Sequence, residues 1–241
     1  MAVMRLLLFF VLSSFAVSAH AAEQRPFDKT VQWTLSLDAD GNIQDLKPVD
    51  REYLPDVRKQ IEPIVRTWHF TPGKINGRAA PTETTLSVCV RFEADSANAL
   101  SYHAHVVSAS TGPRYQHVVA PRYPDAAKKS HEEGEVMLWV TFDAVGRIVS
   151  AKKMSQMSAE HISPVLVDAA INSVKHWTFR TETVGGHGVA SEALVPVCFM
   201  MSPTAQCQWK QRADKKPVRS GEAIALSSVV GLNTGDEAHL P

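Results

Sequence analysis

The 241-residue sequence lacks the short motifs that mark most enzymes. It contains no Gly-x-Ser-x-Gly, no His-Glu-x-x-His and no glycine-rich phosphate loop. It also lacks an excess of either charge, with 25 basic and 25 acidic residues. General nucleic-acid binding needs a basic surface that displaces counterions from phosphate. We therefore expect a protein that is not an enzyme, uses no cofactor and binds no nucleic acid.

Cysteine is scarce, and no Cys-x-x-Cys motif occurs, so neither a redox motif nor a paired zinc knuckle is indicated. The three cysteines are Cys89, Cys198 and Cys207. An odd number allows at most one bridge within the chain. A Cys89–Cys198 bridge, a Cys198–Cys207 bridge and unpaired thiols all remain open, because pairing depends on Cα separation. His103 and His105 lie in a polar stretch without a completing acid or thiol, so we predict no metal site.

Long apolar runs are also missing, with one exception near the N-terminus. Leu6 to Ala19 is apolar, follows Arg5, and is followed by small residues in Ala19-His20-Ala21. The run is shorter than the ~20 residues that span a bilayer, and it ends in a pattern typical of signal-peptidase cleavage. We expect residues 1–21 to be a cleaved export signal. The alternative is a retained membrane anchor, and only then is membrane association expected.

The rest of the chain has the composition of a packed protein, with 44% hydrophobic and 21% charged residues. Residues 31–37 alternate between apolar and polar, which predicts a half-buried strand. Asp38 to Gly41 is a turn signal, and residues 43–49 can return as a second strand. From Pro55 the apolar spacing becomes helical and ends at Trp68, with Pro63 expected to kink or restart the helix. Residues 84–92 alternate again.

A second stretch repeats this order. Residues 136–142 alternate, Asp143 to Gly146 forms a turn, and Ser163-Pro164 is typical of a helix start. The hairpins match after a shift of about 105 positions, and the helices and last strands after about 109. We therefore predict two copies of one β-β-α-β unit. Only the second is preceded by a short helix from Tyr123-Pro124, stopped by Gly134.

These residues resemble the TonB C-terminal domain family. The resemblance rests on Tyr123-Pro124 before a short helix, Asp143-x-x-Gly146-x-Ile148, a helix ending in Trp177-x-Phe179, and a last strand with Val195-x-Val197-x-Phe199. TolA domains have a similar fold. The resemblance implies an α+β fold in which each copy is a three-stranded antiparallel sheet with helices on one face. We expect a truncated copy at residues 26–93, a connector at 94–116, a complete domain at 117–202 and a mostly disordered tail at 203–241, in which only residues 223–230 suggest a short strand.

The resemblance also implies a periplasmic function. TonB recruits an extended segment, the TonB box, from outer-membrane transporters along the edge of its last strand, and an edge strand offers unpaired backbone groups to such a segment. The expected partner-binding residues are Arg122, Tyr123, Pro124, Glu192, Leu194, Val195, Val197 and Phe199. We expect partners among envelope proteins, such as TonB-dependent transporters. The alternatives are an assembly protein or homo-oligomer whose edge strands pair with one another, and an energy transducer that keeps its N-terminal anchor.

One further surface stands out. Trp139, Met137, Cys198 and Met200 are expected on the sheet face away from the helices. This face either packs against another part of the chain or forms a partner-binding patch.

Overall fold

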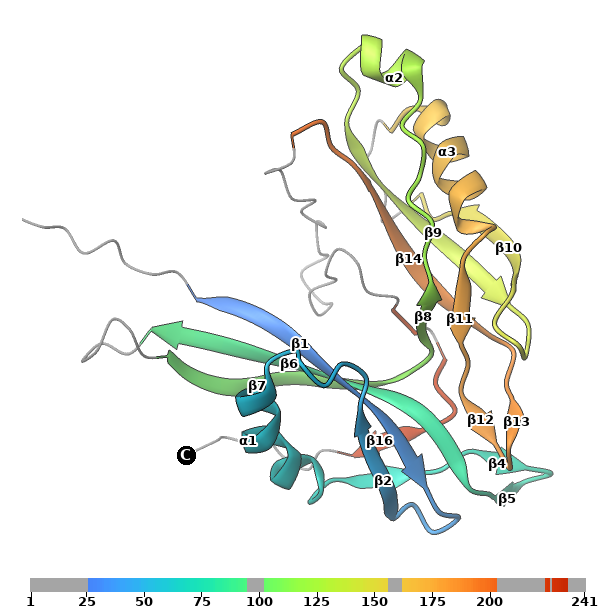
Figure 1. Cartoon of the computed structure of the whole chain (residues 1–241). Coiled ribbons are helices and arrows are strands. Elements are labelled where there is room, and N and C mark those ends of the chain that lie inside the picture. The colour runs from blue at the N-terminus through green and yellow to red at the C-terminus, as the bar shows by residue number, and fades with distance from the viewer. Residues whose placement is uncertain (1–25, 95–101, 156–161, 203–223, 226, 234–241) are drawn as a thin grey trace, which may run out of the picture.

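A computed structural model describes residues 26–94, 102–155, 162–202, 224–225 and 227–233. The expected export signal lies outside these residues. Among these residues antiparallel sheet dominates, accompanied by three short helices (Figure 1), which agrees with the α+β class. Within the described part of the chain, no helix is both long and apolar enough to span a membrane.

The N-terminal sheet has the strand order β13-β12-β6-β1-β2, and β7 also pairs with β6. Its own part of the chain supplies β1 (Phe27–Leu37), β2 (Ile43–Pro48), β6 (Thr82–Ala94) and β7 (Tyr102–Gly112). Two short strands, β12 (Thr183–Val184) and β13 (His187–Gly188), come from much later in the sequence. The helix of this part is α1 (Pro55–Val65).

The C-terminal sheet has the order β10-β9-β14-β15. Its strands are β9 (Gly134–Phe142), β10 (Ile148–Lys153), β14 (Ser191–Phe199) and β15 (Ile224–Ala225). Helix α3 (Pro164–Val174) packs on it, and α2 (Asp125–Lys129) lies beside α3. The long central pairing of β9 with β14 runs in one register from Gly134–Phe199 to Phe142–Ser191.

Three small two-stranded sheets complete the fold. β3 (His69–Thr71) pairs with β16 (Gly231–Asn233), and β8 (Arg114–His117) pairs with β11 (Thr178–Arg180). β4 (Lys74–Ile75) and β5 (Arg78–Ala79) form a hairpin. The first two pairings join segments that lie far apart in the sequence.

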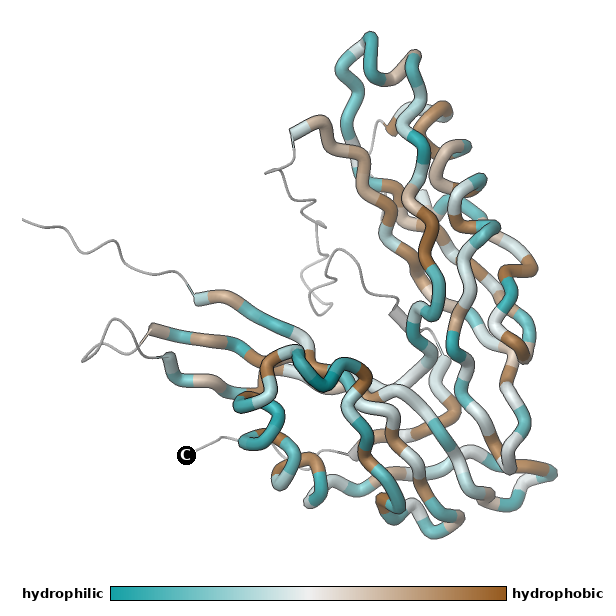
Figure 2. Tube along the Cα trace, in the orientation of Figure 1, coloured by the Kyte–Doolittle hydropathy of each residue, from teal (hydrophilic) through white to brown (hydrophobic). Residues whose placement is uncertain are grey.

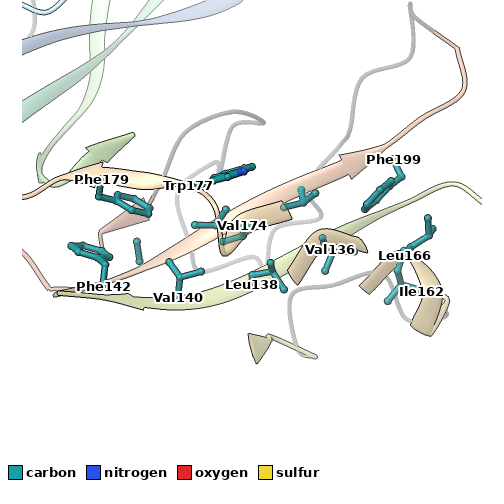
Figure 3. Close-up of a cluster of buried hydrophobic side chains, with 14 of the residues drawn as sticks. Val136, Leu138, Val140, Phe142, Ile162, Leu166, Val174, Trp177, Phe179 and Phe199 are labelled. Atoms are coloured by element: carbon teal, nitrogen blue, oxygen red, sulfur yellow. The ribbon is translucent and has the colours of Figure 1, made fainter. Parts of the chain in front are cut away.

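Helix α3 covers one face of the C-terminal sheet, as its apolar spacing predicts. Leu166, Ala170 and Val174 are fully buried against alternate residues of β9, and Trp177 closes the stripe. Figure 3 shows Leu166 and Val174 of the helix beside Val136 and Leu138 of the sheet, with the ring of Phe179 over that of Phe142. Ser163 caps the helix by accepting a hydrogen bond from the Val165 amide. The apolar residues of both sheets recur along the strands (Figure 2).

The N-terminal core follows the same plan. Trp33, Leu35 and Leu86 are fully buried below Ile61 and Val65 of α1. The helix does not restart at Pro63, because Pro63 lies in the last turn and α1 ends two residues later, at Val65. Val230, from the C-terminal segment, is also buried in this core.

The two Asp-x-x-Gly turns form as predicted. Asp38 Oδ1 accepts hydrogen bonds from the Asp40 and Asn42 amides, each at 2.9 Å. The pKa of Asp38 is lowered, first by the side-chain hydrogen bond from Asn42. Asp143 Oδ1 accepts in the same way from the Val145 and Arg147 amides. The turn residue Gly146 has φ +84° and lies so close to Phe179 that a Cβ there would be 1.8 Å from the Phe179 carbonyl oxygen.

The structure differs from the sequence-based prediction in two segments. The expected connector, 94–116, contains β7 and most of β8, and β7 pairs with β6 from Thr85 to Ala94. The expected tail contributes β15 and β16 within its described residues. Both sheets therefore contain more strands than the three expected. The connector reveals little strand signal in the sequence, because its pairing depends on the edge that receives it.

Candidate functional site

The candidate site is the outer edge of β14. One side of β14 pairs along its full length with β9. On its other side, among the described residues, β15 pairs only with Ala193 and Leu194, in the antiparallel direction. The strand therefore lies at the edge of the C-terminal sheet, as expected, but one end of the edge is already covered by the chain itself.

The direction of the backbone groups can be worked out from a hydrogen bond in the neighbouring strands. The Met154 amide donates to the Met137 carbonyl at 2.8 Å, so the backbone of Met137 points toward β10. Its cross-strand partner in β14 is Pro196. Because antiparallel pairs alternate between bonded and non-bonded, the backbone of Pro196 points away from β9, toward the edge. Proline has no N–H, and edge positions of this kind are where sheets accept it.

Alternation then assigns the predicted site residues to two groups. Val195, Val197 and Phe199 have their side chains in the core and their backbone groups paired with β9. The strand period turns both their side chains and their backbones away from the edge, and their contact with a partner stays a prediction. Their contribution is to hold β14 in place.

Glu192 and Leu194 belong to the other group, whose backbone groups face the edge. Leu194 is buried on the sheet face away from α3, and Glu192 accepts a hydrogen bond from Trp139 Nε1 at 3.0 Å. Met137, on the same face, is fully buried, whereas Trp139 is 41% exposed. The expected patch is therefore mostly covered, and only Trp139 is strongly exposed.

Arg122, Tyr123 and Pro124 lie just before α2, where the resemblance places the entry of the partner. Arg122 is exposed, and Pro124 is the N-cap of α2. The ring of Tyr123 contacts that of Phe199 edge-on at 5.5 Å, and its hydroxyl donates to the Glu132 carbonyl. Desolvation raises the pKa of Tyr123, and the carboxylates of Glu133 and Glu132 add to this shift. Tyr123 therefore links the helix entry to the far end of β14.

The cysteines are not equivalent. Cys198 of β14 is disulfide-bonded, whereas Cys89 of β6 is not. The expected alternative of a Cys89–Cys198 bridge is therefore wrong. Cys207 lies outside the described residues. No cluster of His, Cys, Asp or Glu suited to a metal ion occurs among the described residues.

The matching edge in the N-terminal sheet is filled. β6 is paired with β12 at Thr82 and Glu83, and with β7 from Thr85 to Ala94. An incoming strand has no place there unless one of these strands leaves. Of the two last strands, only β14 has an edge that is mostly uncovered by the described residues.

Sequence reasoning missed Pro196 as part of this edge, and it placed a short strand at residues 223–230 without pairing that strand with β14. Pro196 could have been noticed, since proline inside a strand pattern indicates an edge. The pairing of β15 with β14 has no such signal, because the sequence of a short strand does not indicate which edge receives it.

Comparison with known proteins supports the resemblance of the C-terminal sheet region to TonB domains. Residues 119–201 match the family model described as "Gram-negative bacterial TonB protein C-terminal". The chain is 36% identical over 84 residues to Protein TonB from two strains of Xanthomonas campestris pv. campestris. It is 31% identical over 83 residues to Protein TonB from Vibrio cholerae serotype O1.

These alignments cover 34% of this chain and 35% or 32% of the relatives, so the chain spans about a third of their length. The family match at residues 119–201 includes the helix entry at Tyr123, the helix α3 and all of β14. Residues 119–201 therefore belong to the TonB C-terminal domain family.

Proposed function

We propose that residues 119–201 form a protein-binding module that takes up extended segments of envelope proteins as an added antiparallel strand on β14. The observation that carries this proposal is β15. A segment of the chain itself lies antiparallel on the β14 edge at Ala193 and Leu194. Backbone pairing at a sheet edge depends little on the identity of the added strand, so the geometry that receives β15 suits other extended peptides.

We also propose that the N-terminal part of the chain is a second copy of this unit. The bounds of α1 fall on those of α3 after a shift of 109 positions, and β3, β4 and β5 fall on β11, β12 and β13. β2 falls on β10 after a shift of 105. Since β7 and β12 fill the β6 edge, this copy supports the fold and does not receive a partner.

The family suggests where the module works and what it binds. Its relatives are named Protein TonB, and TonB-like domains act in the periplasm on TonB-dependent transporters. We propose an exported, periplasmic protein linked to TonB-dependent transport, with transporter segments as its partners. The apolar run at Leu6 to Ala19 supports export.

A pair of substitutions at Leu194 tests the edge. Leu194→Pro removes an N–H that faces the edge and that a peptide reaches by displacing β15, whereas Leu194→Ala shortens the side chain but keeps the N–H. Titration of the full chain with a synthetic TonB-box peptide should show binding to the wild type and to Leu194→Ala, and at least tenfold weaker binding to Leu194→Pro. That factor corresponds to about 1.4 kcal/mol, within the range for a backbone hydrogen bond.

Two results would contradict the proposal. One is the absence of peptide binding to the wild type. The other is equal affinity of the two Leu194 variants, which would place the peptide elsewhere. Amide shifts in the wild type should concentrate at the edge-facing residues of β14.

An assembly function is the second candidate, and a specific observation favours it. The chain already places its own strands on both the β6 edge and the β14 edge. The same contacts made between chains would give an oligomer. Sedimentation velocity separates the two candidates, because assembly predicts a concentration-dependent dimer that Leu194→Pro disrupts without any added peptide.

A further inference from the structure

The C-terminal segment 227–233 joins the two main sheets. β16 within it pairs with β3 in the N-terminal part, and Val230 is buried in the N-terminal core. At the other end of the segment, Ser191 of β14 donates from its hydroxyl to the Ser227 carbonyl at 3.1 Å. Seven residues therefore contact the start of β14 and the core of the other sheet.

The anchor of this segment is the carboxylate of Glu182, which is 2% exposed. Its Oε1 accepts hydrogen bonds from the Thr84 hydroxyl at 2.6 Å and the Ser228 hydroxyl at 2.7 Å. Its Oε2 accepts from the Val229 amide at 3.0 Å. Two of these three donors belong to the C-terminal segment. A buried carboxylate needs such donors, because without them its desolvation is costly.

A second contact, from strand β7, holds the same segment. The Thr111 hydroxyl of β7 donates to the Val230 carbonyl at 2.9 Å. Thr84 connects the two contacts. Its hydroxyl donates to Glu182 and accepts from the amide of Gly112, the residue after Thr111, at 3.0 Å. Glu182, Thr84 and Thr111 thus come from three separate stretches of sequence and converge on residues 228–230.

The N-terminal part has no counterpart of this anchor. The position that matches Glu182 after the shift of 109 is Gly73. A Cβ at Gly73 would lie 2.5 Å from Val184 Cγ2, so a side chain there would collide with β12. The carboxylate site is therefore specific to one side of the junction.

The two linking segments follow reciprocal paths. The segment with β7 and β8 pairs first with β6 and then with β11, so it passes from the N-terminal part to the C-terminal part. The segment with β15 and β16 pairs first with β14 and then with β3, which is the reverse passage. Each segment therefore pairs with the last long strand of one part and with a short strand of the other part.

We infer that Glu182, with Thr84 and Thr111, forms a binding site for the chain's own residues 228–230, and that occupancy of this site keeps β15 on the edge of β14. The segment acts as a latch. When it is held at Glu182, β15 covers Leu194, and when it leaves, that edge position is exposed. The control of peptide access rests on the function proposed above, whereas the latch itself does not.

Hydrogen exchange of the full-length chain tests the latch directly. Glu182→Gln replaces one accepting oxygen with an NH₂ group, which cannot accept the hydrogen bonds that Glu182 now receives. The segment should therefore be held less tightly, and amides of residues 227–233 should exchange at least tenfold faster. Glu83→Gln is the matched control, because the Glu83 carboxylate at the same junction pairs with Arg180 at 2.6 Å and not with residues 228–230. Its exchange at 227–233 should equal that of the wild type.

Ser228→Ala provides a second variant that leaves the carboxylate in place. It removes one donor to Glu182, and it also removes the hydroxyl that accepts from the Val230 amide at 3.1 Å and bonds to Thr111 at 3.0 Å. Exchange in this variant is therefore read at residues 231–233, where it should be accelerated in the same direction. Normal exchange at these residues in both Glu182→Gln and Ser228→Ala would overturn the latch.

Titration with a TonB-box peptide then tests control of the edge. Binding at least threefold tighter to Ser228→Ala than to the wild type supports it. Equal affinity, together with accelerated exchange, would overturn control of the edge by the latch. If no variant binds peptide while exchange still accelerates, the proposed function fails and the latch stands.

Discussion

The close approach of Gly146 to Phe179 yields a quantitative prediction, because the chain contains a matched glycine without such a neighbour. Gly146 has φ +84° and Gly186 has φ +81°. A Cβ at Gly146 would lie 1.8 Å from the Phe179 carbonyl oxygen, whereas at Gly186 it would meet nothing within 4 Å. Alanine at either site carries the same left-handed strain, and only Gly146→Ala adds a collision.

The expected costs follow from these contacts. Gly186→Ala should lower the free energy of unfolding by about 1–2 kcal/mol, the cost of a left-handed alanine. Gly146→Ala must also move the backbone at Phe179, whose amide donates to the Gly146 carbonyl at 2.8 Å and whose ring stacks on Phe142 at 4.5 Å. Loss of about 1 kcal/mol for each contact gives a total of about 3–4 kcal/mol.

Urea denaturation of the full chain, followed by tryptophan fluorescence, measures both costs. The midpoint of Gly146→Ala should fall well below that of Gly186→Ala, with similar slopes. Equal destabilisation by the two substitutions would refute the reasoning, because it would mean that the turn can move away from Phe179 at no cost. Intermediate values would measure how far the backbone relaxes.

Two other predictions concern single side chains. Val230→Ala should lower the free energy of unfolding by about 2 kcal/mol, because Val230 is 4% exposed in the N-terminal core; Val145→Ala, at a 65% exposed position, should change it by less than about 0.5 kcal/mol in the same urea assay. Because the pKa of Tyr123 is raised in the folded protein, its contribution to stability is fully present below the unfolded value of 10.0 and is lost as the pH rises through the folded value. The urea midpoint of the wild type should therefore fall more steeply above pH 10.0 than that of Tyr123→Phe, and parallel curves would contradict this.

Much of the fold could be predicted from local patterns. The helical spacing that ends at Trp68 and Trp177 predicted α1 and α3, because a helix packed on a sheet must bury one face. The turn residues Asp38 and Asp143 predicted the hairpins, since a short carboxylate can bond to amides two and four residues on. The position of β14 at a sheet edge also followed from the resemblance.

The candidate site was less predictable. The sequence indicates that Val197 and Phe199 lie in a strand, but not which residues of that strand direct their backbone outward. That direction depends on the register between β9 and β14, which places Pro196 opposite Met137. The coverage of the edge by β15 was equally hidden, because pairing partners more than 25 positions apart leave no local pattern.

The sequence by itself determined the α+β units and their repeated order. It did so through the spacing of apolar residues, the turn residues and the resemblance to a known family, all of which can be read from short stretches. Only the tertiary structure decided how the units are joined. Glu182 looks like any acidic residue in the sequence, yet it is buried, and its acceptors meet Thr84, Ser228 and Val229 from two distant segments. The need of a buried carboxylate for donors can be met by any part of the chain that the fold brings near, so no local sequence pattern could identify them.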